Sequence, residues 1–431
     1  MIPEIELKSL EEQRAFQEQR LPDLLAYLSE KSVYYRELFA EHNIDIKSIN
    51  SLEALQRIPV TTKEDLQTRN QDFVCVSPRE IIDYITTSGT LGDPVTFPLT
   101  DKDLERLAYN ECISFACAQG SADDIYQLMT TMDKRFMAGL AYFMGIRKLG
   151  AGVVRVGGGI PELQWDTLKR INPTAFVTVP SFLLKLIEYA EANGIDYKAT
   201  QINKAICIGE SLRNEDFSLS TLGEKIKEKW DIKLFSTYAS TEMSTAFTEC
   251  EAGLGGHHHP ELVIVEFLDE QNQPVKEGEA GEVVITTLGV EGLPLLRFKT
   301  GDICYHYKEA CSCGRKTIRL GPIIGRKKQM IKYKGTTLYP PALYDILNDI
   351  NGIQNYLVEV FTNELGTDEI VVKVGSKDNS PSFEKEIKDH FRAKLRVAPK
   401  IKFEDSELID KLKNPKLSRK PVLFHDLRVL A

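Results

Sequence analysis

Short β-rich runs alternate with helical stretches between Ile81 and Ser240, and this alternation constrains the fold more than any other feature of the 431 residues. One amphipathic stretch, residues 181–194, has the pattern of a helix that Ser181 could cap and Gly194 could end. Strand–helix alternation predicts a mostly parallel sheet covered by helices. The β-rich runs are IIDYITTSG, DIYQLMTT, GAGVVRVGG, PTAFVTVP, KAICIGE and KLFSTYAS.

The segments on either side of this region have different patterns. The first sixty or so residues carry apolar side chains at helical intervals. After Pro260, closely spaced strands with Gly-rich turns predict a small antiparallel or barrel-like β subdomain at about residues 260–320. Beyond it, a second alternation predicts a compact α+β unit. We therefore predict an α/β protein with a large N-terminal domain, residues 1–326, and a C-terminal α+β domain, residues 327–431.

Composition excludes several classes of protein. A formal net charge of −9 argues against nucleic acid as the main partner, because such binding needs a basic face. The sequence contains no run of 18 or more apolar residues, so we expect no membrane span, and the acidic N-terminus is unlike a secretory signal. Eight cysteines in a chain of this length are no disulfide framework, which favours a reducing cytoplasm. The sequence leaves a homodimer open.

Three short motifs contain residues suited to nucleotide chemistry, and the first spans residues 85–94. Small residues let the backbone approach an anion, while N–H groups and hydroxyls bond phosphate oxygens. It is not a Walker A loop, since no Gly-Lys-Ser/Thr follows, and taken alone it is more often a polar turn. Its candidate phosphate-binding residues are Thr87, Ser88, Gly89 and Thr90.

The other two motifs are residues 237–242 and 297–302. Tyr238 could stack on a base, Thr241 could bond a phosphate, and Glu242 could hold Mg²⁺ through a hard oxygen. In the third motif, Asp302 at a tight turn could accept both hydroxyls of a ribose. Taken alone, the second motif is more often a strand end with a buried tyrosine, and the third is equally plausible as a hairpin turn. The order of the three motifs along the chain carries more weight than any one of them.

Together the motifs resemble the adenylate-forming ligase superfamily and, within it, the phenylacetate–CoA ligase family. The resemblance runs from about residue 20 to Arg428. It implies an ATP-dependent acid–thiol ligase that converts an aryl or arylacetic acid to acyl-AMP and then, with coenzyme A, to acyl-CoA. Further segments that carry it are Val60–Leu66, Gly150–Val154, Val179–Ser181 and Cys311–Arg315 followed by Gly325 and Arg326.

The resemblance also implies a role for single residues around the nucleotide. The hydroxyl and glycine residues of the first motif would wrap the β- and γ-phosphates of ATP. Tyr238 would lie against adenine, Thr241 near the α-phosphate and Glu242 on Mg²⁺. The ribose would be bound by Asp302 and Arg326. The segment lining the adenine and acyl pockets would contain Gly209 and Glu210.

Three C-terminal residues would serve the alternation between two half-reactions. Lys328 falls at the position of the family's domain hinge, and Gly335 matches the glycine beside which pantetheine enters. Lys420 becomes the catalytic lysine, because Asp426 and Arg428 follow at the expected spacing. A lysine can bridge the attacking carboxylate and the α-phosphate. Without the resemblance, Lys420 would be one more lysine in a basic tail.

Some positions depart from the family pattern. Leu91 and Asp93 replace a threonine and a lysine of the phosphate loop, Ala239 replaces a glycine, and Lys328-Gln329 replaces a pair of aspartates at the hinge. Two alternatives to acyl-CoA synthesis stay open, and Leu91, Asp93 and Gln329 support the second of them. One is transfer to a carrier-protein thiol or another acceptor, and the other is a non-catalytic nucleotide-binding protein.

Four residues are candidate ligands for a structural Zn²⁺. Two cysteines at C-x-C spacing, with a distant cysteine and an imidazole, can form a closed tetrahedral set. Spacing alone leaves ordinary cysteines and a surface histidine run equally plausible. Some members of the resembled family carry such a cluster, which favours zinc; His258 and His259 stay open as substitutes or as active-site residues. The proposed ligands are Cys250, His257, Cys311 and Cys313.

Overall fold

The computed structural model describes residues 1–87, 94–334, 336–363, 367–415 and 421–428. The chain forms two compact units. The first consists of Met1–Ser218 and Ile226–Ile323, and the second of Leu219–Lys225 and Ile324–Ala431. The predicted domain boundary between residues 326 and 327 stays a prediction. Among the described helices, none combines the length and apolar character needed to cross a membrane.

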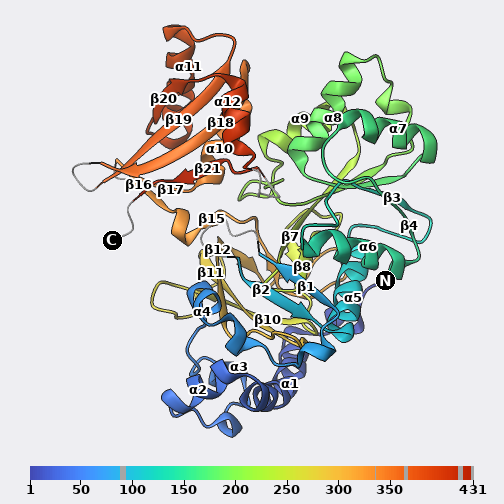
Figure 1. Cartoon of the computed structure of the whole chain (residues 1–431), viewed down its shortest axis with the longest axis vertical. Coiled ribbons are helices and arrows are strands. Elements are labelled where there is room, and N and C mark those ends of the chain that lie inside the picture. Colours follow the sequence, from blue (N-terminus) through green and yellow to red (C-terminus); the bar gives the residue numbers. More distant parts are fainter. Residues whose placement is uncertain (88–93, 335, 364–366, 416–420, 429–431) are drawn as a thin grey trace. The chain divides into compact units, whose positions relative to one another are not determined.

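A six-stranded sheet in the first unit confirms the predicted mostly parallel sheet (Figure 1). Its strand order is β4-β3-β5-β6-β7-β8, and only β8 runs antiparallel to its neighbour. The predicted run at residues 81–89 forms β1 (Asp83–Thr86) instead, which pairs antiparallel with β2 (Thr96–Leu99) in a separate hairpin. The six strands are β3 (Ile125–Leu128), β4 (Gly152–Arg155), β5 (Ala175–Thr178), β6 (Lys204–Cys207), β7 (Lys233–Ser240) and β8 (Thr245–Thr248).

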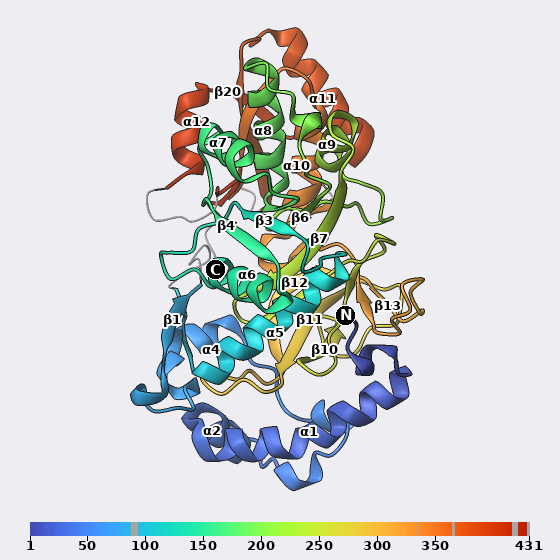
Figure 2. The same ribbon diagram turned by 90° about the vertical axis from the view of Figure 1, so that its right-hand side faces the viewer.

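Helices cover both faces of this sheet (Figure 2). Successive side chains of β5 point to opposite faces. Ala175 and Val177 pack with side chains of α5 and α6, whereas the Phe176 ring meets Trp230 edge-on at 5.8 Å on the other face. Burial on both faces explains why β5 is apolar throughout rather than alternating. The helices are α5 (Asp101–Cys117), α6 (Met137–Leu149), α7 (Pro161–Ile171) and α8 (Pro180–Ala192). Helix α9 (Thr221–Lys229) is divided between the two units, since its residues up to Lys225 belong to the second.

The predicted cap of α8 is wrong. The helix begins at Pro180, so Ser181 lies inside its first turn, and Val179 occupies the N-cap without a side-chain hydrogen bond. Proline suits the first helical position because its fixed φ is helical and its missing N–H is not needed there. Gly194 (φ +65°) takes a left-handed conformation just after the helix ends, close to the predicted stop.

Helices precede the sheet and a β subdomain follows it, as predicted. Strands β10, β11 and β12 form an antiparallel sheet, and β13, β14 and β9 form a smaller one. The N-terminal helices are α1 (Leu10–Lys31), α2 (Val33–Glu41), α3 (Leu52–Leu55) and α4 (Lys63–Thr68). The strands are β9 (Gly256–His257), β10 (Val263–Leu268), β11 (Gly281–Thr287), β12 (Phe298–Cys304), β13 (His306–Tyr307) and β14 (Arg319–Leu320).

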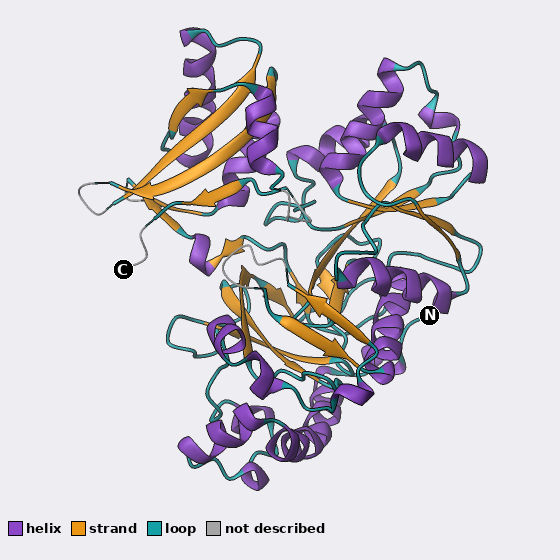
Figure 3. Cartoon of the chain, in the orientation of Figure 1, coloured by secondary structure: helices purple, strands orange, loops and turns teal. Residues whose placement is uncertain are grey.

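The second unit has the predicted α+β architecture (Figure 3). Its main sheet has the order β20-β19-β18-β21. Every second residue of β18 and β19, such as Val358 and Val372, packs against α10 and α11, while Asn355 bonds to α12 on the other face. The elements are β15 (Gly325–Arg326), β16 (Ile331–Tyr333), β17 (Thr336–Leu338), α10 (Pro340–Asp349), β18 (Ile353–Thr362), β19 (Asp368–Ser376), α11 (Pro381–Leu395), β20 (Lys400–Phe403), α12 (Ser406–Lys413) and β21 (Phe424–Asp426).

Candidate active site and metal centre

The carboxyl ends of β6 and β7 bring two of the predicted segments to one edge of the parallel sheet. Cys207 of β6 pairs with Ser236 of β7, so the residues that follow each strand emerge at the same edge. Ligands of open α/β sheets bind outside this edge. Gly209 turns the chain with φ +76°, and Thr241 and Glu242 follow the end of β7.

Glu210 is held by the first turn of α8. Its two carboxylate oxygens accept hydrogen bonds from the backbone N–H of Ser181 at 2.8 Å and from the Ser181 hydroxyl at 2.7 Å. The first turn of a helix has unsatisfied N–H groups and a partial positive charge, which suits a carboxylate. Glu210 therefore ties the end of β6 to α8 and gives this edge of the sheet a fixed wall.

Tyr238 and Asp302 form a direct pair. The Tyr238 hydroxyl donates a 2.8 Å hydrogen bond to Asp302, and its ring stacks on Phe247 with centroids 5.9 Å apart and an interplanar angle of 21°. Burial, reinforced by the Asp302 carboxylate, raises the pKa of the Tyr238 hydroxyl well above its ordinary value. The hydroxyl therefore stays protonated and keeps donating to the carboxylate.

Asp302 does not lie at a hairpin turn, which corrects the prediction for the third motif. It lies within β12, at a β-bulge where the register moves from Glu282↔Ile303 to Val284↔Lys299. Gly301 supplies the positive φ, +80°, that the bulge requires. Bulges redirect side chains, and this one turns Asp302 toward Tyr238 on the neighbouring sheet.

Thr241 and Glu242 lie in the four-residue turn between β7 and β8, beyond the Ser240↔Thr245 pair. The turn closes through a 3.3 Å hydrogen bond from the Ser244 N–H to the Thr241 carbonyl. Buried Arg106 of α5 donates to the Ser244 carbonyl at 2.6 Å and to the carbonyls of Leu288 at 2.7 Å and Leu262 at 2.5 Å. Arg106 thus fixes the turn against the β subdomain.

Lys63 is a site residue to which the sequence analysis gave no role. Its ammonium lies 3.7 Å from the Glu242 carboxylate. Thr61 joins the edge of β12, accepting from the Lys299 N–H at 2.8 Å and donating to the Arg297 carbonyl at 3.0 Å. The Thr62 cap then starts α4 at Lys63. Lys63 lies in the Val60–Leu66 segment, whose resemblance to the family could have pointed to it.

The first motif is only partly described. Thr87 closes the base of its loop: its N–H donates to the Val95 carbonyl and its hydroxyl accepts from the Val95 N–H, both at 3.0 Å. The predicted phosphate contacts of Ser88, Gly89 and Thr90 lie outside the described residues, as do the departures at Leu91 and Asp93.

The four predicted metal ligands come together in the first unit. Their ligand atoms all lie within 4.8 Å of one another. The Cys250 and Cys311 sulfurs are 3.5 Å apart, and the Cys313 sulfur is 3.5 Å from Nε2 of His257. A tetrahedral zinc with ordinary bond lengths places its ligand atoms about 3.5–3.8 Å apart. The donor set and its spacing therefore fit Zn²⁺.

The electrostatics of this cluster favour the thiolate that a metal needs. Burial raises the pKa of the Cys313 thiol, but hydrogen bonds with His257 and Arg315 outweigh it and hold the pKa below its ordinary value. The other two histidines point elsewhere: His258 bonds the Val263 carbonyl at 2.6 Å and His259 bonds Glu6 at 2.6 Å. In the described structure, neither joins the ligand cluster.

Comparison with known proteins decides the family. The family model described as AMP-binding enzyme matches residues 19–291. Phenylacetate-coenzyme A ligase of Thermus thermophilus is 31% identical over 378 residues, covering 86% of this chain and 83% of that protein. The chain belongs to the phenylacetate–CoA ligase family of AMP-binding enzymes. It is therefore an acid–thiol ligase of the AMP-forming class, as the motifs predicted.

Other relatives of the ligase agree. Phenylacetate-coenzyme A ligase of Escherichia coli is 27% identical, with 87% of this chain and 85% of that protein covered. A crystal structure of 2-hydroxyisobutyryl-CoA ligase in the postadenylation state with 2-HIB-AMP has a TM-score of 0.84. That match is 23% identical and covers 99% of this chain and 91% of the other. At this identity it confirms the fold and nothing finer.

In the second unit of the ligase, Arg326 is exposed in β15 and Lys328 lies in the short helix Lys327–Gln329. The carbonyls of Lys328 and Met330 accept from Arg428 at 3.0 and 2.8 Å. The guanidinium of Arg428 also pairs with Asp426 at 2.6 Å and Asp368 at 3.1 Å. Gly335 and Lys420 lie outside the described residues, so their roles stay predictions.

Proposed function

We propose that this ligase uses ATP to convert a carboxylic acid to an acyl-adenylate with release of pyrophosphate, and then transfers the acyl group to coenzyme A with release of AMP. One observation supports this most: in a chain of this family, Tyr238 with Asp302 and Lys63 with Glu242 form two polar pairs around the carboxyl edge of the parallel sheet. That edge is where open α/β folds bind nucleotides.

Each nucleotide contact has a physical reason. Tyr238 offers an aromatic face to adenine. The Asp302 carboxylate accepts hydrogen bonds from the ribose hydroxyls, and the Arg326 guanidinium donates to the ribose oxygens. Thr241 donates to the α-phosphate, and Thr87, Ser88, Gly89 and Thr90 bond the outer phosphates. Glu242 holds Mg²⁺, which offsets the negative charge on the phosphates. Gly209 and Glu210 lie in the segment that lines the adenine and acyl pockets.

The second unit contributes to each half-reaction in turn. Lys420 places its ammonium between the attacking carboxylate and the α-phosphate, where negative charge develops. Rotation at Lys328 then withdraws Lys420 and brings the Gly335 segment to the adenylate for entry of pantetheine. A hinge of this kind lets one site serve two chemistries that need different neighbours.

We propose an aryl or arylacetic acid as substrate, since curated relatives are phenylacetate-coenzyme A ligases. The test is acid-dependent exchange of labelled pyrophosphate into ATP, over a panel of phenylacetate, benzoate, 2-hydroxyisobutyrate and acetate. Phenylacetate or benzoate should give the fastest exchange, and added coenzyme A should give AMP and a thioester. Exchange without a CoA thioester would indicate a carrier protein as acceptor. No exchange with any acid would overturn the proposal.

We also propose a cytoplasmic location, which the lack of a disulfide among the eight described cysteines supports. The acidic net charge of −9 continues to argue against nucleic acid as a partner.

Cys250, His257, Cys311 and Cys313 are proposed to hold a structural Zn²⁺, since all four positions of the tetrahedron are filled by protein. Cys311→Ser should reduce bound zinc from about one per chain to near zero and lower Tm, because a hydroxyl is a poor zinc ligand. Elemental analysis and calorimetry of the purified variant measure both. Cys112→Ser, a buried cysteine of α5 outside the cluster, is the control that should retain zinc. Full zinc in Cys311→Ser would exclude this site.

A further inference from the structure

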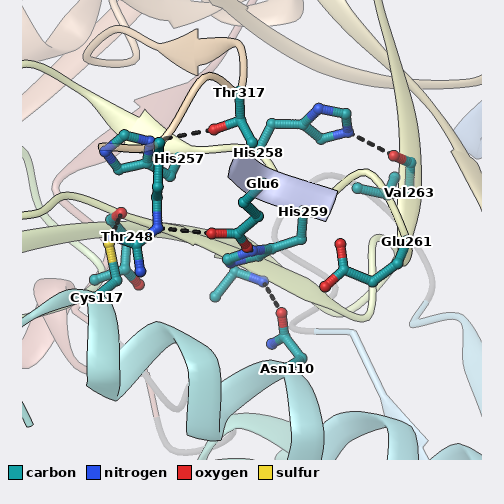
Figure 4. A network of polar contacts seen from close by, with 12 residues as sticks. Glu6, Asn110, Cys117, Thr248, His257, His258, His259, Glu261, Val263 and Thr317 are labelled. Carbon is teal, nitrogen blue, oxygen red and sulfur yellow. Dashed lines mark hydrogen bonds and ion pairs between the residues drawn. The ribbon is translucent and has the colours of Figure 1, made fainter. Parts of the chain in front are cut away.

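The N-terminal segment inserts a buried carboxylate beside the cysteine cluster. Glu6 belongs to the short 3₁₀ helix Glu4–Leu7 and is completely buried. One carboxylate oxygen is 2.6 Å from Nδ1 of His259, and the other accepts from Nε of Arg315 at 2.6 Å. Figure 4 shows Glu6 reaching toward His259 while His258 is turned toward Val263. A charge buried this deeply is retained only with such partners.

Arg315 connects this carboxylate to the cluster. Its Nη1 lies 3.5 Å from the Cys313 sulfur, within hydrogen-bonding reach, and only 3% of the residue is exposed. The Cys311–Arg315 loop is closed by two backbone hydrogen bonds, from Cys311 N–H to Arg315 carbonyl at 2.9 Å and from Gly314 N–H to Cys311 carbonyl at 3.0 Å. The guanidinium is thus part of the loop that carries two of the four ligands.

The main chain makes a second link. The Lys316 N–H donates to the Glu6 carbonyl at 2.8 Å, directly after the ligand loop. Glu6 therefore holds this loop through both its side chain and its backbone. Its neighbour Glu4 makes no such contact: the Glu4 side chain is 83% exposed and pairs with Lys8 on the surface.

The charges at the metal centre indicate a role for Arg315. Three thiolates around Zn²⁺ leave a net charge of about −1 on the site. A guanidinium N–H directed at one sulfur offsets that charge, and outer partners of this kind orient ligands and tune metal affinity. Arg315 can do this only while its direction is fixed, and Glu6 is the carboxylate that fixes it.

We propose that Glu6 holds Arg315 and the ligand loop in place at the metal centre, so that docking of the N-terminal segment and retention of zinc are coupled. The proposal rests on the metal centre proposed above. Loss of the metal releases the ligand loop and with it the Arg315 and Lys316 contacts of Glu6. Loss of the Glu6 carboxylate frees the Arg315 guanidinium and weakens metal retention.

The first test compares Glu6→Gln with Glu4→Gln in the full-length protein. Glutamine keeps the shape of glutamate but removes its charge. In Glu6→Gln, zinc should be released to a chromogenic chelator on the order of 10–100-fold faster than in the wild type. The affinity for Co²⁺, followed by its absorption, should be weaker by a similar factor. Both quantities should equal those of the wild type in Glu4→Gln. Equal values in the two variants would overturn the proposal.

The second test needs no variant and so does not depend on how Glu6→Gln folds. Hydrogen exchange of wild-type protein, with and without removal of zinc by a chelator, should show faster exchange at residues 4–8 and at Lys316 after removal. Exchange in α11, in the second unit, serves as the internal reference. Unchanged exchange at residues 4–8 would overturn the coupling while leaving the zinc site intact. Absence of zinc from the purified wild type, or its full retention in Cys311→Ser, would instead overturn the metal centre itself.

Discussion

Lys420→Ala is expected to slow acyl-adenylate formation by about 10²–10³-fold while leaving thioester formation from supplied acyl-adenylate close to the wild-type rate. The reason is that the proposed ammonium offsets charge that develops only when the carboxylate attacks the α-phosphorus. Once the adenylate exists, that charge has left with pyrophosphate. Rapid-quench measurement of each half-reaction separates the two rates.

Lys411→Ala is the matched control, because it removes an exposed lysine from α12 of the same unit. It should leave both half-reactions unchanged. Equal losses in the two half-reactions of Lys420→Ala would show that the lysine supports the fold of the second unit or binds nucleotide generally. An unaffected first half-reaction would place the catalytic cation elsewhere.

Glu242→Gln is expected to reduce adenylate formation by about 10²-fold or more and to raise the Mg²⁺ concentration needed for half-maximal rate. An amide oxygen carries no net charge and is a weaker ligand for Mg²⁺ than a carboxylate. The turn itself should persist, since its closure depends on the Ser244 N–H and on Arg106 rather than on the Glu242 side chain. Initial rates over a Mg²⁺ titration measure both effects.

Two further variants make this result specific. Lys63→Met removes the cation 3.7 Å from Glu242 and leaves the carboxylate, so it should not raise the Mg²⁺ requirement. Glu105→Gln removes an exposed carboxylate of α5 and should behave as wild type. If Lys63→Met and Glu242→Gln raised the Mg²⁺ requirement equally, the pair would be a structural ion pair, and Glu242 would not be the metal ligand.

Local features of this protein were predictable from its sequence because they depend on neighbouring residues. The five parallel strands each correspond to a short apolar run between turn signals, and the antiparallel sheets follow closely spaced runs. The gathering of Cys250, His257, Cys311 and Cys313 was also predicted, but their spacing alone left ordinary cysteines equally plausible, and the family resemblance decided for a cluster.

Features that depend on distant pairings were not predictable. Asp302 was placed at a turn, because a Thr-Gly-Asp sequence has the same composition in a hairpin and in a bulge, and only the β11 partner decides which forms. Lys63 meets Glu242 through the pairing of Thr61 with β12. Glu6 meets Arg315 across 309 residues of chain. The N-cap of α8 was misplaced by two residues, at Ser181 instead of Val179, because Pro180 already starts the helix.

The contacts of Arg428 define where the proposed hinge can bend. The Arg428 guanidinium donates to the carbonyl oxygens of Lys328 and Met330 and also pairs with Asp426 and Asp368 of the same unit. Arg428 therefore fixes the two carbonyls relative to that unit. The peptide plane that follows Lys328 is therefore part of the rigid body it would carry. Torsion at Gln329 would break these bonds, whereas torsion about the φ and ψ bonds of Lys328 would leave them intact. Rotation of the unit is thereby confined to the backbone torsions of Lys328 and of the residues that precede it.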